Sequence, residues 1–275
     1  MMNIKSIFRY FMNKNETFNM FIKNLLVFNS RLKLKFKGIS TFTDRDYLNL
    51  INVARKHEKA FAEFKGCHTG KKIAIFATGP SLNKYKEIPD IIKIGVNKSF
   101  LKDNLKLDYL FMQDWGVREY INELDNPKYE NIIKFFGVAP ENSFDRKDCS
   151  LKHAIIPESI VLKYKARQYF QHSSYLQSEI KFYKDIETNY IECGGTVALA
   201  AMQFALYTNP AKIYLIGCDC SNGHYITQNG NSRFTHLIEP WIKLKEFANI
   251  YYPDTEIISV NPIGLRGLFT DLDQE

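Results

Sequence analysis

Short apolar runs, each followed by glycine or a small polar residue, recur along the chain from residue 71 onward. The first run, residues 73–77, breaks off at the sequence Thr-Gly-Pro-Ser. It is too short for a typical helix and has no polar side, so it predicts a strand buried on both faces of a parallel sheet. We expect strands of the same kind at residues 91–96, 107–112, 131–136, 212–217 and 256–260, with a shorter one at 153–156.

Helical patterns separate most of these strands. Residues 44–64 predict an amphipathic helix, in which His57 lies in a charged run and is expected to face solvent. Residues 195–207 predict a buried helix of small residues, and residues 237–248 predict another helix. Residues 159–185 are rich in Tyr, Gln and Lys, and we expect them to be helical and to cover the site as a lid.

The alternation of strands and helices predicts an α/β fold with a Rossmann-like, doubly wound and mostly parallel sheet. We expect one domain of this kind at residues 66–270 and a helical extension at residues 1–65. Residues 1–37 of this extension are basic and aromatic, with Glu16 as their only acidic residue. One interpretation is an interfacial helix on an anionic membrane surface. The other is a helix packed on the domain or on a second subunit of a homo-oligomer.

Polar residues follow the predicted strands at their carboxyl ends. In open α/β sheets, ligands bind outside these ends, at the point where the strand order reverses. Each such residue alone is also typical of a turn or a helix cap. Together they predict a ligand crevice, because several strands bring them to one edge of the sheet. The strands end in Thr78-Gly79, Asn97, Asp114, Asp219 and Asn261.

The turn after the first strand is a candidate phosphate site. Gly79 permits a tight turn and a close approach of the backbone to a ligand. Pro80 suits the first turn of a helix, so Ser81, Leu82 and Asn83 would present free backbone amides at a helix N-terminus. The alternative is an ordinary turn with nothing bound, because a single glycine turn is a weak motif.

Two further segments are candidates for the chemistry. Gly194 and Gly195 open the buried helix and make a second N-terminal anion site, with Thr196 as a hydroxyl donor. The second segment is the loop at 219–236, which contains Tyr225, His236 and a further histidine, His224, without a distinguishing context. A histidine can act as a general base, and a tyrosine hydroxyl can stabilise a departing phosphate. The alternative for His236 is a purely structural role at a helix N-terminus.

Composition narrows the partners. The chain has 275 residues and a formal charge of +7, which suits an anionic partner such as a nucleotide. The basic residues cluster in the N-terminal extension and form no recognised nucleic-acid module, so we expect no nucleic-acid partner.

Five cysteines without framework spacing indicate reduced thiols. No apolar stretch approaches the ~20 residues that cross a bilayer, and we find no secretory signal. We therefore expect a cytoplasmic protein, or one peripheral at the inner face of the membrane.

Several common catalytic signatures are missing from the sequence. It has no Walker A lysine motif and no Gly-x-Gly-x-x-Gly, which disfavours ATPase and classical dinucleotide-binding functions. It also has no Gly-x-Ser-x-Gly of a serine hydrolase. The Asp-x-Asp sequences at 44–46 and 271–273 lie in a predicted helix and in a predicted frayed tail, not at strand ends. We therefore expect no metal site and no cofactor.

Several of these segments, taken in order, resemble the bacterial sialyltransferases of glycosyltransferase family 42. They resemble equally the related motility accessory factors, whose core is the domain of unknown function 115. The resemblance covers roughly residues 70–265 and rests on residues 75–82, Asn97, residues 194–197, residues 213–219 and the spacing from Tyr225 to His236. It implies a single-domain, GT-A-like, inverting and metal-independent glycosyltransferase. Such an enzyme would transfer sialic acid or a related nonulosonic acid from a CMP-activated donor to a bacterial surface glycan, such as lipopolysaccharide or capsule.

The resemblance also implies roles for individual residues. His236 matches the general base of the family, and Tyr225 matches a tyrosine that contacts the leaving phosphate. Asn97 and Asp114 match positions that contact the nucleotide and the donor. The whole donor site implied by the strand ends and the resemblance is Thr78, Gly79, Pro80, Ser81, Asn97, Asp114, Gly194, Gly195, Thr196, Asp219, Ser221 and Asn261.

Departures from the family pattern leave the donor open. Thr78 and Asp114 stand where the sialyltransferases have asparagine, and Ser221 stands where a second phosphate-binding tyrosine is expected. The Gly-Gly-Thr-Val sequence at 194–197 is closer to the motility accessory factors. Two alternatives remain: a pyrophosphokinase that uses ATP and Mg²⁺, with Asp114 and Asp219 as ligands, or a non-catalytic nucleotide-binding protein.

Overall fold

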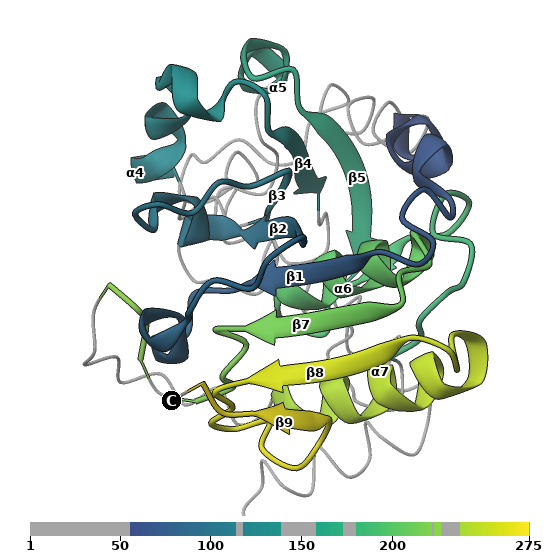
Figure 1. Cartoon of the computed structure of the whole chain (residues 1–275). Coiled ribbons are helices and arrows are strands. Elements are labelled where there is room, and N and C mark those ends of the chain that lie inside the picture. The colour runs from purple at the N-terminus through teal and green to yellow at the C-terminus, as the bar shows by residue number, and fades with distance from the viewer. Residues whose placement is uncertain are drawn as a thin grey trace, which may run out of the picture.

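Nine parallel strands form one sheet in the order β6-β5-β4-β3-β2-β1-β7-β8-β9 (Figure 1). The computed structural model describes residues 56–113, 118–138, 158–172, 180–221, 223–226 and 237–274. The sheet confirms the predicted Rossmann-like α/β fold. The strands are β1 (Lys72–Phe76), β2 (Ile92–Val96), β3 (Tyr109–Met112), β4 (Ile133–Val138), β5 (Arg167–His172), β6 (Ile191–Glu192), β7 (Lys212–Ile216), β8 (Glu256–Val260) and β9 (Thr270–Leu272).

The strand order reverses at β1. The chain first adds β2 to β6 on one side of β1, and then returns to add β7 to β9 on the other side. β1 and β7 pair in parallel from Lys72 opposite Lys212 to Phe76 opposite Ile216. Their carboxyl ends therefore lie side by side at the switch point, where ligands of open α/β sheets bind.

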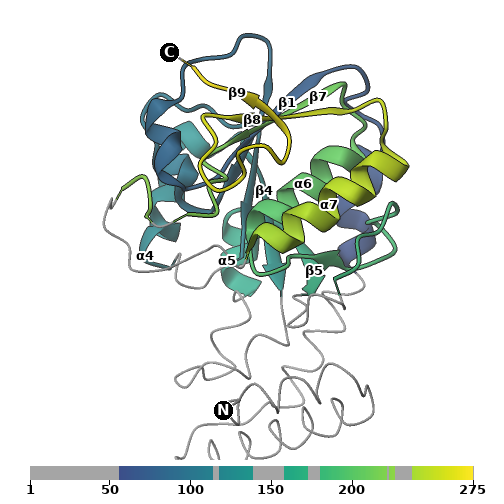
Figure 2. The ribbon, with the colours of Figure 1, turned by 90° about the horizontal axis from the view of Figure 1, so that it is seen from below.

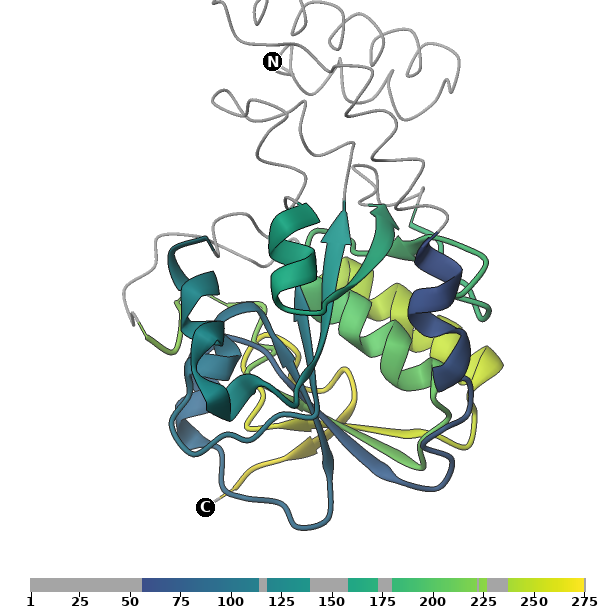
Figure 3. The ribbon, with the colours of Figure 1, turned by 90° about the horizontal axis from the view of Figure 1, so that it is seen from above.

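Helices cover both faces of the sheet. On one face lie α6 (Val197–Tyr207) and α7 (Ile238–Tyr251), side by side in Figure 2. Figure 3 shows the strands between these two helices and the elements of the other face. The elements of the other face include α4 (Arg118–Ile121), α5 (Glu158–Lys163), and the 3₁₀ helices η2 (Pro80–Lys84), η3 (Asn97–Leu101), η5 (Asn122–Asp125) and η6 (Pro127–Tyr129).

In the part of the chain that the structure describes, no helix is long and apolar enough to cross a membrane.

Alternating side chains of the central strands enter two separate cores. In β1, Ile73 and Ile75 pack in the core under α6, whereas Ala74 and Phe76 pack in the opposite core. Both sets are fully buried. This explains why the strands read as continuous apolar runs rather than as an alternating pattern. All of α6 is buried as well, so its sequence has no polar stripe.

The described end of the predicted N-terminal extension packs on this sheet. Residues 56–61 are helical and lead into η1 (Ala62–Phe64). Phe61 is fully buried, and its ring stacks on Phe135 of β4 with the ring centroids 5.3 Å apart. Phe64 meets Phe204 of α6 edge to face at 5.3 Å. Aromatic contacts of this kind add to the stability gained from burial. The basic, aromatic segment 1–37 lies outside the described residues, so both interpretations of it stay predictions.

Three expectations from the sequence are wrong. The segment expected to be a helical lid contains α5 but then β5, an internal strand of the sheet. The tail expected to be frayed contains β9, which pairs with β8. His57, expected in solvent, is 5% exposed. Its Nε2 lies 2.6 Å from the carbonyl oxygen of Ile186 and 2.7 Å from that of Asn189, and its Nδ1 accepts from the amide of Phe170. The short strand expected at 153–156 lies outside the described residues.

Candidate functional site

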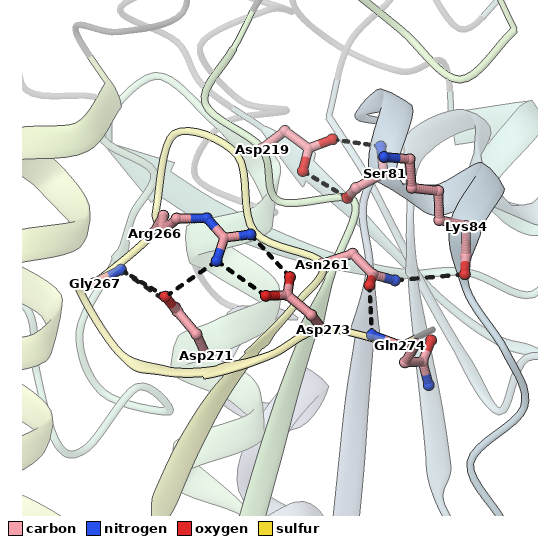
Figure 4. Close-up of polar contacts among 9 residues, drawn as sticks. All are labelled: Ser81, Lys84, Asp219, Asn261, Arg266, Gly267, Asp271, Asp273 and Gln274. Carbon is pink, nitrogen blue, oxygen red and sulfur yellow. Dashed lines mark hydrogen bonds and ion pairs between the residues drawn. The ribbon is translucent and has the colours of Figure 1, made fainter.

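The carboxylate of Asp219 joins the ends of β7 and β1. Its Oδ2 accepts from the backbone amide of Ser81 at 2.7 Å, and its Oδ1 accepts from the Ser81 hydroxyl at 2.5 Å (Figure 4). Asp219 is 5% exposed, and burial raises the pKa of its carboxyl group, while the two bonds from Ser81 act in the opposite direction. Pro80 opens η2, a 3₁₀ helix of five residues rather than the α-helix that the sequence suggested. Both donors of Ser81 are therefore engaged within the protein.

Gly79 is required at this junction because there is no room for a side chain. A Cβ atom at Gly79 would lie 2.3 Å from Oδ2 of Asp219 and 2.6 Å from the carbonyl oxygen of Gly217. The amide of Gly79 also donates to that carbonyl at 2.8 Å. The two strand ends are thus in direct backbone contact at the switch point. The sequence indicated Gly79, but not the part played by Gly217, because the contact depends on β1 and β7 being neighbours.

The short segment 223–226 lies over the turn that follows β1. The amide of Tyr225 donates to the carbonyl oxygen of Thr78 at 2.9 Å, and Nδ2 of Asn83 donates to the carbonyl oxygen of Tyr225 at 2.9 Å. The Tyr225 hydroxyl donates to the carbonyl oxygen of Lys98 at 2.7 Å. Burial raises the pKa of Tyr225 to about 12, so its phenol is a neutral donor at physiological pH. Tyr225 thus reaches the ends of both β1 and β2.

His224 stacks on the ring of Tyr225, with centroids 5.0 Å apart. Its Nδ1 accepts from the amide of Ile226 at 3.2 Å, so a neutral His224 carries its proton on Nε2. Burial and the nearby Lys98 ammonium lower the pKa of His224. Nothing in the sequence singled out this histidine, because part of its environment is Lys98, which comes from a distant part of the chain.

Asn97 and Asn261 follow β2 and β8 and both adopt left-handed backbone conformations, with φ of 47° and 49°. Asparagine is one of the few residues that tolerate this region. Oδ1 of Asn97 accepts from the amide of Gln113 at 3.3 Å. The side chain of Asn261 is held by backbone groups on both sides (Figure 4). Asp114, the residue after Gln113, lies outside the described residues.

The turn before α6 is closed by its own residues. Gly194 and Gly195 have φ of 46° and 88°, and the amide of Gly194 donates to Oε1 of Glu192 at 2.8 Å. Oγ of Thr196 accepts from the amide of Ala198 and caps α6. The carboxylate of Glu192 and the hydroxyl of Thr196 therefore already accept from two backbone amides of this turn, where the sequence predicted an anionic ligand.

The start of α7 packs directly on this turn. A Cβ atom at Gly194 would lie 2.8 Å from Cβ of Pro240, and one at Gly195 would lie 3.1 Å from Cδ2 of Leu237. The turn before α6 and the first turn of α7 are thus neighbours. His236, which precedes Leu237, lies outside the described residues, and its role stays a prediction.

Lysines surround the switch point on the side of η2 and η3. Lys102 Nζ donates to Oδ1 of Asn83 at 3.1 Å, and Lys98 Nζ lies 3.9 Å from the centre of the Tyr120 ring. Lys84 is close enough to Asp219 to favour its ionised form. This edge of the sheet therefore carries positive charge beside the Asp219 carboxylate, whereas the amides of Gly79, Ser81 and Leu82 are already bonded within the protein.

The described residues contain no group of three or more His, Cys, Asp or Glu side chains placed to hold a metal ion. Asp219, a proposed Mg²⁺ ligand in the pyrophosphokinase alternative, has both oxygens bonded to Ser81. Among the described residues, Oγ of Ser221 and Oε1 of Gln113 are buried and have no hydrogen-bond partner. A bound water or ion is one explanation of such buried polar atoms.

The structure therefore places many of the described residues that the sequence singled out in two groups. One group gathers around the ends of β1, β7 and β8, and a second group lies at the turn before α6, next to the start of α7. The residues that sequence reasoning missed are Lys98, which follows the predicted strand 91–96, and Gly217, the last residue of the predicted strand 212–217. Asn83 was expected to offer a backbone amide, whereas its side chain donates to the carbonyl oxygen of Tyr225. Hydrogen bonds and close contacts link Thr78, Gly79, Ser81, Asp219, Tyr225 and Asn261 to these strand ends.

No protein-family model matches the sequence, and no curated protein matches it. Among solved structures, the MAf glycosyltransferase from Magnetospirillum magneticum AMB-1 is similar at 11% identity with a TM-score of 0.45. That match covers 81% of this chain but 38% of the other, so the chain spans well under half the length of that protein.

The sialyltransferase CstII from Campylobacter jejuni is similar in two structures. In complex with the substrate analogue CMP-3FNeuAc it is 16% identical, with a TM-score of 0.40 and coverage of 74% of this chain and 85% of that one. In complex with cytidine-5′-monophosphate it is 15% identical, with a TM-score of 0.41 and coverage of 70% and 80%. All three are distant likenesses.

Proposed function

We propose that this protein is a glycosyltransferase that takes a sugar from a nucleotide-activated donor. The observation that supports this most is the arrangement at the switch point, where the Ser81–Asp219 bond and the Thr78–Tyr225 bond gather three chain segments beside Lys84 and Lys98. A crevice at this place in an open α/β sheet is a typical nucleotide site. The resemblance of the sequence to sialyltransferases and motility accessory factors supplies the reaction class.

The donor phosphate lies, in this proposal, between the turn at Gly79 and the side chains of Lys84, Lys98 and Tyr225. The lysines offset its charge, and the tyrosine donates a hydrogen bond. For this to happen, the Tyr225 hydroxyl turns its proton from the Lys98 carbonyl to a phosphate oxygen. That rotation moves no backbone atom. Stabilising the phosphate as it leaves lowers the barrier more than binding the intact donor does.

The reaction is a single displacement. An oxygen of the acceptor attacks the anomeric carbon, the bond from that carbon to the phosphate oxygen breaks, and the nucleotide departs with the electron pair. His236 takes the proton of the attacking hydroxyl. A histidine with a pKa near its ordinary value serves as a base at neutral pH. One displacement inverts the configuration, and the lysines and tyrosine allow the step to proceed without a metal ion.

We further propose a CMP-activated donor of the sialic acid type and an acceptor on a bacterial surface glycan. The protein would work in the cytoplasm or at the inner face of the membrane, with its basic N-terminal segment as the membrane contact. These statements rest on the resemblance and on the charge of residues 1–37.

Thermal shift of the full chain with CMP, UDP, GDP and ATP tests the nucleotide class, because a ligand that binds the folded state raises its midpoint. We expect CMP to give the largest shift. Transfer from a CMP-linked sialic acid to a lactose acceptor is then measured with and without EDTA. Activity that survives EDTA supports the proposal. A shift with ATP and Mg²⁺ alone, with phosphate transfer abolished by EDTA, contradicts it and favours a pyrophosphokinase.

A further inference from the structure

The C-terminal segment 261–274 is tied to the loop that follows β1. Asn261 Oδ1 accepts from the amide of Gln274 at 2.8 Å, and Asn261 Nδ2 lies 3.4 Å from the carbonyl oxygen of Lys84, the last residue of η2 (Figure 4). The Gln274 side chain then holds the backbone of Lys86, with Oε1 accepting from its amide at 2.8 Å and Nε2 donating to its carbonyl at 2.9 Å. Both ends of each amide side chain are therefore used.

The same segment also supports Asp219. The amide of Gly264 donates to the carbonyl oxygen of Asp219 at 2.7 Å. A Cβ atom at Gly264 would lie 2.5 Å from that oxygen and 2.8 Å from the carbonyl oxygen of Cys220, so the two backbones are in contact. Asp219 in turn holds Ser81. The segment therefore contacts the turn at residues 79–86 in two ways, directly through Asn261 and Gln274 and indirectly through Asp219.

An ion pair closes the segment on itself. The guanidinium of Arg266 donates to both oxygens of Asp273, at 2.8 and 3.0 Å, and the amide of Gly267 donates to Asp271 (Figure 4). The bidentate geometry fixes the direction of the chain that enters Gln274. Leu265, which is 1% exposed, anchors the middle of the segment in the core under α7.

We infer that residues 261–274 form a strap that sets the position of the turn at residues 79–86, with Asn261 and Gln274 as positioning residues. The sequence placed Asn261 among the groups that touch the ligand. The geometry instead gives both of its polar atoms to the backbone of the strap and of η2. The strap acts on the ligand through Lys84 and Ser81, and in this respect the inference rests on the proposed function.

Hydrogen exchange and nucleotide binding of full-length variants test the strap together. N261G removes the amide but keeps the left-handed backbone accessible, and Q274A removes both bonds to Lys86. N261D keeps the acceptor for the Gln274 amide but loses the donor to the Lys84 carbonyl, so it separates the two bonds of this side chain. I263A is the matched control on the same strap, because Ile263 is 47% exposed and lies outside both cores. The probe is CMP.

In N261G and Q274A we expect faster amide exchange at residues 80–86 and CMP binding weaker by about five- to tenfold, the equivalent of one or two lost hydrogen bonds. N261D should also speed exchange at residues 80–86 and weaken CMP binding, because it loses the bond to Lys84, whereas I263A should match the unchanged protein in both measurements. Unchanged exchange at residues 80–86 in both N261G and Q274A overturns the strap. Faster exchange with unchanged CMP affinity overturns the positioning role. If the unchanged protein binds no nucleotide, the proposed function fails, while exchange still decides whether the strap holds the turn.

Discussion

Asp219 and Ser81 are 138 positions apart in the sequence, yet the carboxylate of the first accepts both the amide and the hydroxyl of the second. The bond exists because β1 and β7 are neighbours at the point of strand reversal. The shape of the turn at residues 79–86 depends on this contact. Its two hydrogen bonds can be removed by separate substitutions.

Replacing Ser81 and replacing Asp219 should lower the free energy of unfolding by different amounts. S81A removes the hydroxyl bond but leaves the amide bond, so we expect the free energy of unfolding to fall by about 1 kcal/mol. D219A leaves the buried amide of Ser81 without a partner, and we expect a loss of about 2 kcal/mol together with loss of CMP binding. Urea unfolding and thermal shift with CMP measure the two effects. Equal losses in the two variants would show that the amide bond contributes nothing.

G79A tests the close contact between the two strand ends. The added methyl group would lie 2.3 Å from Oδ2 of Asp219, so we expect Asp219 to be displaced from Ser81 and the melting temperature to fall by several degrees. G70A is the control, because a Cβ atom there meets nothing within 4 Å although φ is +74°. A smaller loss of stability in G70A than in G79A is expected from calorimetry. The reverse order would mean that backbone strain outweighs the steric clash.

His57 should make stability depend on pH. Burial lowers its pKa below the ordinary value of 6.5. Below pH 6.5 the unfolded chain therefore binds a proton that the folded chain does not, so stability is fully present above this pH and falls as the pH drops toward the folded pKa. Protonation would also place a proton on Nδ1, which accepts from the amide of Phe170.

Urea midpoints at pH 5.5 and 7.5 measure this effect. In H57Q the amide side chain can donate and accept but does not titrate, so other acid-sensitive groups cancel in the comparison. We expect the midpoint of the unchanged protein to fall more on acidification than that of H57Q. Parallel falls in the two proteins would remove His57 as the cause.

Substitutions of the two candidate catalytic residues should lower turnover for different reasons. H236A removes the proposed base, so we expect turnover to fall by about 10² to 10⁴ while the CMP affinity stays within about twofold. Y225F removes the donor to the leaving phosphate and its bond to the Lys98 carbonyl, so turnover should fall while the stacking on His224 persists. Initial rates and CMP binding separate these effects. Full turnover in H236A would exclude this residue as the base.

The sheet was predictable from sequence because its central strands are buried on both faces. Ile73 and Phe76 enter different cores, so nothing polar interrupts the run. β5 was missed because it buries Gln168 and Gln171, which read as surface residues. β9 was missed because all three of its side chains are exposed. In both strands the pairing with neighbours, not the local composition, decides the structure.

The site shows a similar division. The rule about strand ends found Asp219 and Ser81, but no local pattern could show that they bond to each other, since this depends on the order of strands. His57 was misjudged for the same reason, because its partners Ile186 and Asn189 lie about 130 positions away. Asn261 was found as a strand end, yet its partners come from η2 and from Gln274.

The connection from β8 to β9 has a consequence for the behaviour of the protein at the edge of the sheet. Parallel strands are usually joined by a dozen or more residues that include a helix, whereas residues 261–269 make this crossing without one. β9 therefore lacks a packed helix of its own, and its place on β8 depends on the contacts of the strap. Detachment bares the backbone of β8, a ladder of unpaired donors and acceptors on which another polypeptide can pair. Variants that break the strap should therefore self-associate more readily than the unchanged protein, through the exposed edge of β8.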